Sequence, residues 1–214
     1  MAKNLKQILE EIEFLYSQSS IEKRATTQPF VLEKIKEKFP DYGYKPEDMI
    51  IRESLIEHSG SLPIVATTLF PYLDDPDVDL GKSLTMLAIH DIGELVVGDE
   101  IVFSKTISKD EEMTAAKRLL NPIYYELYDD VESQNSKSAK FAKAIDKITP
   151  DILDYLTPPE ITVERYKHFT GTDRDGIVNL IRKFKRPYML WNPFMTEFHD
   201  YLMEQLERKI SKVR

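Results

Sequence analysis

Apolar side chains recur at helical spacing along most of the chain, and this periodicity restricts the possible fold more than any other feature. In the first segment the apolar positions follow the period of an α-helix: Leu5, Ile8, Leu9, Ile12, Leu15 and Tyr16. Near the C-terminus they repeat every four residues: Phe194, Phe198, Leu202, Leu206 and Ile210. The sequence contains no strand-rich region. It therefore predicts an all-α helical bundle of roughly eight helices.

Turn and capping residues divide this pattern into separate helices. Asp79 can cap a helix that continues through apolar residues to His90. Ser108 and Glu111 have the spacing of a capping box, which predicts a long helix ending near Tyr128. The helices expected between the first and the last cover residues 29–39, 54–73, 79–90, 108–128 and 136–155, with a short one after a polar loop at 170–176. Loops are expected at 41–52 and at 96–105, the second being a candidate active-site loop.

Composition excludes several classes of function. The 214 residues include no Cys, so any metal must be held by nitrogen and oxygen ligands rather than thiolates. A formal net charge of −8 argues against non-specific binding to DNA or RNA. No run approaches the roughly 18 apolar residues of a membrane span, and we expect a cytoplasmic protein. The length fits a single domain over residues 1–214.

Acidic residues cluster around His58 and His90, two of the four His. Glu57 precedes His58, Asp91 follows His90, and Glu94 comes three residues after Asp91, at the end of a strongly apolar expected helix. Burying imidazoles and carboxylates there without a partner would cost several kcal/mol, whereas a divalent cation would compensate both. These residues therefore indicate a metal site.

The order of three separate motifs resembles the HD-domain phosphohydrolase superfamily. A His (His58) is followed by an adjacent His-Asp pair (His90-Asp91) and then by a lone Asp (Asp146), all in a helical setting. The segments 53–59, 90–99 and 132–147 resemble in particular the 5'-deoxynucleotidase branch, which hydrolyses deoxynucleoside monophosphates. The resemblance covers residues 53–154. It implies a metal-site core at about 50–157 with helical N- and C-terminal extensions.

The resemblance also implies a role for each motif residue. It implies that one divalent ion is held by four side chains: His58, His90, Asp91 and Asp146. Such a mixed nitrogen and oxygen set suits Mn, Co, Fe, Ni or Mg without dictating one of them. Glu94, on the same face of a continuing helix, would orient or deprotonate the attacking water. Asp99 would contact the substrate and shape the transition state, and Gly98 would let the backbone turn before it.

The implied reaction is in-line attack of a metal-activated water on the 5'-phosphate of a (deoxy)nucleoside monophosphate. Members of that branch carry an Arg followed closely by a Trp upstream of the first His, but the only Trp in this sequence is Trp191. Arg52 is the candidate replacement for that phosphate contact. The sequence thus indicates phosphate-ester hydrolysis more firmly than any particular nucleotide, and the resemblance implies a homodimer.

Three alternatives stay open at this point. A phosphodiesterase of the same superfamily, acting on a cyclic or signalling nucleotide, would need additional ligands, and His168 and His199 are poorly placed for this in the sequence. A catalytically inert nucleotide-binding regulator would be favoured if Glu94 or Asp99 lay far from the metal. A carboxylate-bridged di-iron bundle needs two Glu-x-x-His motifs, and the sequence has none.

Overall fold

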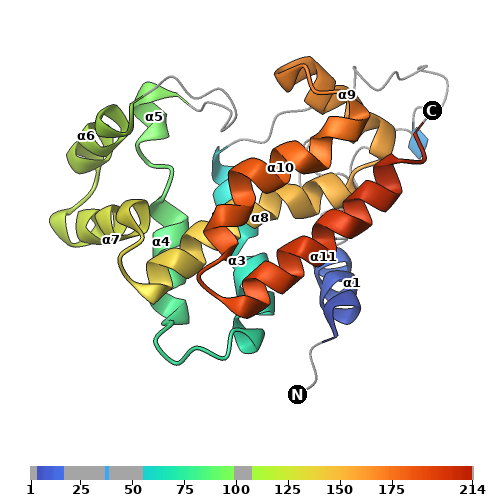
Figure 1. The fold of residues 1–214 in the computed structure, drawn as a ribbon. Helices are drawn as coiled ribbons and strands as arrows, with labels where there is room; N and C mark the ends of the chain where they lie inside the picture. The colour runs from blue at the N-terminus through green and yellow to red at the C-terminus, as the bar shows by residue number, and fades with distance from the viewer. Residues whose placement is uncertain (1–3, 17–36, 39–54, 99–107, 214) are drawn as a thin grey trace.

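The computed structural model describes residues 4–16, 37–38, 55–98 and 108–213, and the regular structure of these residues is entirely helical (Figure 1). None of the described residues lies in a β-strand. The predicted all-α class is therefore confirmed. No helix among the described residues is both long enough and apolar enough to cross a membrane.

Most of the described residues belong to α-helices, and short 3-10 helices connect some of them. The α-helices are α1 (Leu5–Tyr16), α3 (Leu55–Leu69), α4 (Leu80–Ile89), α5 (Glu94–Val97), α6 (Lys109–Leu119), α7 (Pro122–Ser133), α8 (Lys137–Leu156), α9 (Pro159–Thr170), α10 (Ile177–Lys185) and α11 (Pro193–Ile210). The short 3-10 helices that connect some of them are η4 (Phe70–Tyr72), η5 (Arg174–Gly176) and η6 (Arg186–Met189).

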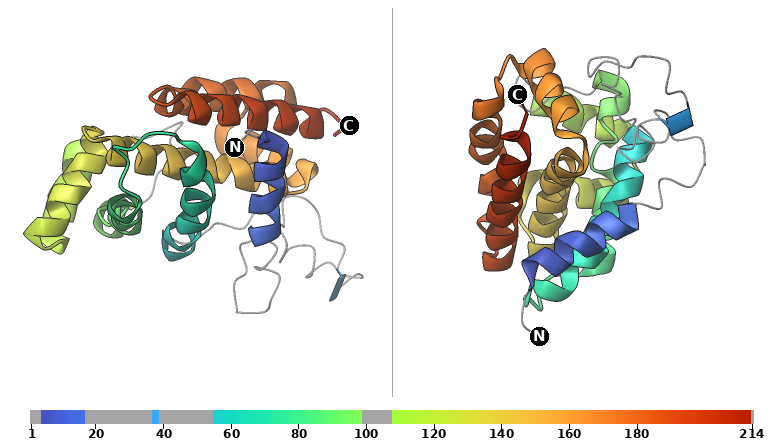
Figure 2. Two further views of the ribbon diagram at one scale, coloured as in Figure 1. Left: turned by 90° about the horizontal axis from the view of Figure 1, so that it is seen from below. Right: turned by 90° about the vertical axis from the view of Figure 1, so that its right-hand side faces the viewer.

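Helix α8 is the centre of the structure. It begins after Ser136, whose hydroxyl accepts a hydrogen bond from the backbone N–H of Ala139 at 3.1 Å. Its apolar stripe is fully buried and consists of Ala142, Ile145, Ile148 and Ile152. The helix packs against α3, α4, α7 and α11. Figure 2 shows α10 and α11 on one side of α8 and α3 and α4 on the other, so elements distant in sequence meet along this helix.

The predicted caps of α4 and α6 are present. The Asp79 carboxylate accepts a hydrogen bond from the backbone N–H of Lys82 at 2.9 Å. At α6, the backbone N–H of Glu111 donates to the Ser108 hydroxyl, and the Glu111 carboxylate accepts from the Ser108 backbone N–H. The capping box therefore forms as its spacing predicts.

The prediction of one helix over 108–128 was wrong, because Pro122 divides this segment. Proline has no N–H to donate and disfavours helical geometry in the residue before it. The chain accordingly leaves the helix at Leu120 (φ −93°, ψ 145°), and Asn121 caps the next helix by accepting from the backbone N–H of Ile123. Two helices, α6 and α7, therefore replace the single expected one.

Other expectations differ from the structure at their ends. The helix expected over 54–73 ends at Leu69 and continues as the 3-10 turn η4. Helix α9 has no counterpart among the expected helices; it begins at Pro159, whose fixed φ and missing N–H suit the first turn of a helix. Of the expected loop at 96–105, Val96 and Val97 belong to α5. The expected loop at 41–52, residues 99–105 of the second loop and nearly all of the helix expected at 29–39 lie outside the described residues.

Candidate metal centre

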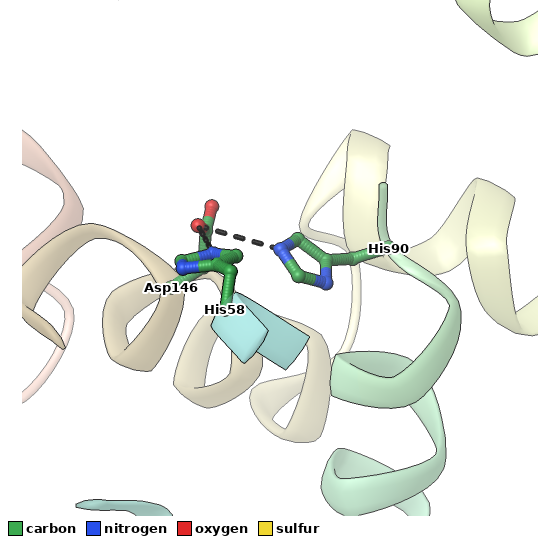
Figure 3. Close-up of side chains that lie close together, drawn as sticks. All are labelled: His58, His90 and Asp146. Carbon is green, nitrogen blue, oxygen red and sulfur yellow. Dashed lines mark hydrogen bonds and ion pairs between the residues drawn. The ribbon is translucent and has the colours of Figure 1, made fainter. Parts of the chain in front are cut away.

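Three packed helices bring the candidate metal ligands together. His58 comes from α3, His90 follows the last residue of α4, and Asp146 lies in the middle of α8. Figure 3 shows these three side chains pointing toward one another. One ligand atom from each lies within 4.8 Å of the others, which is the arrangement of a group that could hold a metal ion.

The distances between the ligand atoms fit one shared ion. The Nε2 atoms of His58 and His90 each lie 3.4 Å from Asp146 Oδ1. Asp91 Oδ2 lies 3.0 Å from His90 Nε2 and 3.7 Å from His58 Nε2. Metal–nitrogen and metal–oxygen bonds of about 2.1 Å would place neighbouring donors of an octahedral ion about 3 Å apart. The ligand atoms of His58, His90 and Asp146 thus surround a space of the right size, whereas Asp91 lies beside the two imidazoles but outside this group of three.

The orientation of His90 also suits metal binding. Its Nδ1 donates a hydrogen bond to the backbone carbonyl of Leu87 at 2.8 Å, so the lone pair of the neutral ring lies on Nε2. That Nε2 atom is buried and makes no hydrogen bond with any of the described residues. A backbone carbonyl that fixes the tautomer and leaves the other nitrogen toward the ligand group is the usual arrangement around a metal-binding His.

The electrostatics favour a cation. Burial alone would raise the pKa of the Asp146 carboxyl, but Lys147 and His90 outweigh it and hold this pKa well below its usual range. Burial would lower the pKa of His90, but the carboxylates of Asp91 and Asp146 outweigh it and raise the pKa to about 9. The carboxylates therefore stay ionised at neutral pH, and a proton competes with a cation for His90 Nε2.

Glu94 follows Asp91 through a tight turn and not along a continuous helix. The prediction that α4 continues to Glu94 was wrong, because α4 ends at Ile89 and a tight turn follows. In that turn the backbone N–H of Glu94 donates to the carbonyl of Asp91 at 2.9 Å. Side chains three residues apart eclipse one another in such i→i+3 geometry, so Glu94 still follows Asp91 on the same side. Its carboxylate oxygen Oε2 is buried.

The turn is held against α6 and α7 by Gly93. A Cβ atom at this position would lie 2.6 Å from the backbone carbonyl oxygen of Glu112 and 3.3 Å from the Tyr128 hydroxyl. No side chain fits at that distance. Gly93 therefore allows the backbone between Asp91 and Glu94 to lie directly on the neighbouring helices.

Sequence reasoning missed two lysines beside Asp146. Lys147 Nζ lies 2.9 Å from Asp146 Oδ2, and Lys143 Nζ lies 3.9 Å from the same oxygen. Lys143 also donates to the Glu132 carboxylate of α7 at 2.6 Å. Burial opposes the charged form of both lysines, but the carboxylates, Asp146 first among them, outweigh it and raise the pKa of each. The available signal was a Lys one turn before Asp146 and another directly after it.

The remaining candidate residues lie elsewhere. Arg52 and Asp99 fall outside the described residues, whereas Gly98 has the positive φ (+88°) expected for a turn. His168 is exposed on α9, and its ring meets Phe169 edge-on. His199 is fully buried on α11, and its Nε2 lies 3.9 Å from Asp151. Within the described part of the chain neither His belongs to the metal-ligand group, so a second metal ion has no support there.

Comparison with known proteins agrees with this geometry. The model of the HD domain family matches residues 44–169, more than half of the chain, and the chain belongs to this family. It is 27% identical over 119 residues to the 5'-deoxynucleotidase HDDC2 of Homo sapiens; the alignment covers 50% of this chain and 56% of that protein. The fold is similar, with a TM-score of 0.56 and 25% identity, to the crystal structure of a predicted metal-dependent phosphohydrolase from Magnetospirillum magnetotacticum MS-1, over 93% of this chain and 97% of the other.

Proposed function

We propose that this chain is a metal-dependent phosphohydrolase that removes the 5'-phosphate of (deoxy)nucleoside monophosphates. The observation that carries the proposal is the convergence of His58, His90 and Asp146 on one space. Asp91 adds a carboxylate oxygen 3.0 Å from His90 Nε2, and Glu94 follows Asp91 by one turn. The names of the two similar proteins, a 5'-deoxynucleotidase and a predicted metal-dependent phosphohydrolase, support this choice of reaction and substrate.

In this proposal the side chains of the protein bind one ion and accept one proton. The ion would be held by His58, His90, Asp91 and Asp146. When bound, a divalent ion supplies charge neutralisation for the phosphate and lowers the pKa of a water. Glu94 orients the attacking water and accepts its proton as the new P–O bond forms. The bond to the 5'-oxygen breaks, and this oxygen takes up a proton from solvent, so that nucleoside and phosphate are released. Asp99 and Arg52 remain the candidate substrate contacts of this proposal.

The test is a hydrolysis assay with the purified protein, supplemented in turn with Mn, Co, Ni, Fe and Mg ions. Nucleoside monophosphates, triphosphates and cyclic nucleotides serve as substrates, with phosphate or nucleoside release as the readout. We expect monophosphates to be cleaved. Preferential cleavage of cyclic nucleotides or triphosphates would contradict the substrate assignment but leave metal-dependent hydrolysis intact.

Variants then test the residue roles. Asp91→Ala should abolish turnover because it removes a metal ligand. Glu94→Gln should lower kcat by about 10²–10⁴-fold, the usual contribution of a general base, with metal binding preserved. His168→Gln is the matched control, because that His is exposed and outside the ligand group. Turnover at the wild-type level in both Asp91→Ala and Glu94→Gln would refute the mechanism.

A further inference from the structure

The two oxygens of the Asp146 carboxylate face different partners. Oδ1 lies 3.4 Å from the Nε2 atoms of both His58 and His90, on the side of the candidate ion. Oδ2 faces the lysines of its own helix and lies 2.9 Å from Lys147 Nζ. One oxygen therefore faces the candidate metal centre, and the other is paired with an ammonium group.

The contact is an ion pair, because Oδ2 makes no hydrogen bond with the described residues, and burial strengthens it. The side chains of Asp146 and Lys147 are 8% and 21% exposed, so solvent screens their attraction only weakly. A buried ammonium group costs several kcal/mol unless an anion compensates it, and Asp146 is the carboxylate that lies beside Lys147. On its other side, Lys147 Nζ lies 6.0 Å from the centre of the Tyr188 ring in η6. These contacts restrict where the ammonium group can go.

Lys143 makes a different set of contacts. Its shortest is to Glu132 of α7, at 2.6 Å, and it lies 3.9 Å from Asp146 Oδ2. Glu132 also lies 3.7 Å from Lys109 of α6. Lys143 thus connects α8 to the neighbouring helices, whereas Lys147 acts directly on the carboxylate.

We propose that Lys147 is a positioning residue that holds Asp146 Oδ2 and so restricts Asp146 to a single metal-binding oxygen, Oδ1. The expected effect on kcat rests on the proposed function, whereas the expected binding of an ion through Oδ1 alone does not. A carboxylate can bind a divalent ion through one or both oxygens. With Oδ2 held by Lys147, the coordination position that a second oxygen would fill stays open for substrate phosphate or water.

The experiment compares Lys147→Met with the wild-type protein, each loaded with Co²⁺. The visible absorption of Co²⁺ reports its coordination number, so release of Oδ2 should change the spectrum. In the hydrolysis assay kcat should fall about 10–100-fold, the usual effect of losing an outer partner of a metal ligand, with KM for the monophosphate nearly unchanged. Lys147→Arg, which keeps a charged donor, should restore the wild-type spectrum.

Controls separate this role from a general loss of structure. Lys140→Met, on the same helix, should change neither spectrum nor kcat, because Lys140 makes no ion pair with the described residues. Lys143→Met should lower stability by leaving Glu132 less compensated, but keep the wild-type Co²⁺ spectrum. If Lys147→Met does not fold, Lys147→Gln is measured in the same way.

An unchanged Co²⁺ spectrum in folded Lys147→Met would overturn the inference. An unchanged spectrum together with a raised KM would show that Lys147 contacts the substrate phosphate instead. If the wild-type protein hydrolyses no phosphate ester, the proposed function fails, yet the spectrum still decides the role of Lys147. The two failures are therefore distinguishable.

Discussion

Replacing Gly93 by Ala would drive a methyl group into the backbone of α6. The added Cβ would lie 2.6 Å from the carbonyl oxygen of Glu112, 3.2 Å from its carbonyl carbon and 3.3 Å from the Tyr128 hydroxyl. The backbone itself presents no obstacle, since Gly93 has φ −62° and ψ −33°, which Ala adopts readily. The whole effect of the substitution should therefore come from the close contact between this turn and α6.

The contact sets the expected magnitude. Forcing an extra carbon into a packed region typically costs about 1–3 kcal/mol, because backbone or side chains must shift. Ala in place of Gly returns about 0.5–1 kcal/mol by restricting the unfolded chain. The free energy of unfolding should thus fall by about 1–2 kcal/mol, and for a chain of this size Tm should fall by about 2–8 °C.

Urea and thermal unfolding followed by circular dichroism measure this change. Gly60→Ala is the matched control, because Gly60 lies inside α3 and a Cβ there meets no atom within 4 Å. It should stabilise the protein by up to about 1 kcal/mol. If Gly93→Ala is as stable as Gly60→Ala, the close packing of the turn on α6 is wrong. Because Gly93 stands between Asp91 and Glu94, kcat should also fall, by up to about 10²-fold for a displacement near 1 Å.

Three further predictions concern stability. Addition of Mn²⁺ at about 100 times its Kd should raise the free energy of unfolding by about 2.7 kcal/mol, and a chelator should reverse this increase. If none of Mn, Co, Ni, Fe or Mg ions changes the free energy of unfolding, the metal centre is contradicted. Burial lowers the pKa of His199; Lys185 adds to this effect, and the carboxylates of Asp151 and Asp200 only partly oppose it. As pH falls through about 6.5, the imidazole of His199 is therefore protonated in the unfolded chain before it is protonated in the folded protein. Wild-type stability should therefore decrease from pH 7.5 to 5.5 more steeply than that of His199→Gln, and equal slopes in urea titrations would disprove this. Ser108→Ala should cost about 1 kcal/mol by removing the cap of α6, and an unchanged urea midpoint would contradict the capping box.

The sequence was most informative about the fold where local chemistry decides the structure. The predicted caps at Asp79 and Ser108 depend on a side chain and a backbone N–H a few residues away, and both are present. The apolar periodicity was less informative at Pro122, because it runs across the proline and conceals the break between α6 and α7. The same ambiguity concealed α9, since Pro159 can follow one helix or occupy the first turn of another.

The candidate site could be predicted only in part. The motif resemblance predicted four candidate ligands, of which the structure brings His58, His90 and Asp146 into one group, but periodicity alone does not show that α3, α4 and α8 pack side by side. Lys147 was missed for a physical reason. A Lys on an amphipathic helix normally extends into solvent, and only the tertiary neighbours of α8 show that this one is largely buried beside a carboxylate.

The arrangement of the helices connects core packing directly to the chemistry of the site. Asp146 stands next to Ile145, and two residues before Ile148, on a helix whose apolar face is fully buried. His90 is fixed by the carbonyl of Leu87, itself a fully buried residue of α4. The three side chains that could hold an ion therefore come from packed helices or from the residue directly after one, and such preorganised donors stay in place before an ion arrives. It follows that core substitutions along the buried face of α8 should change metal affinity as well as stability, because the same helix supports both.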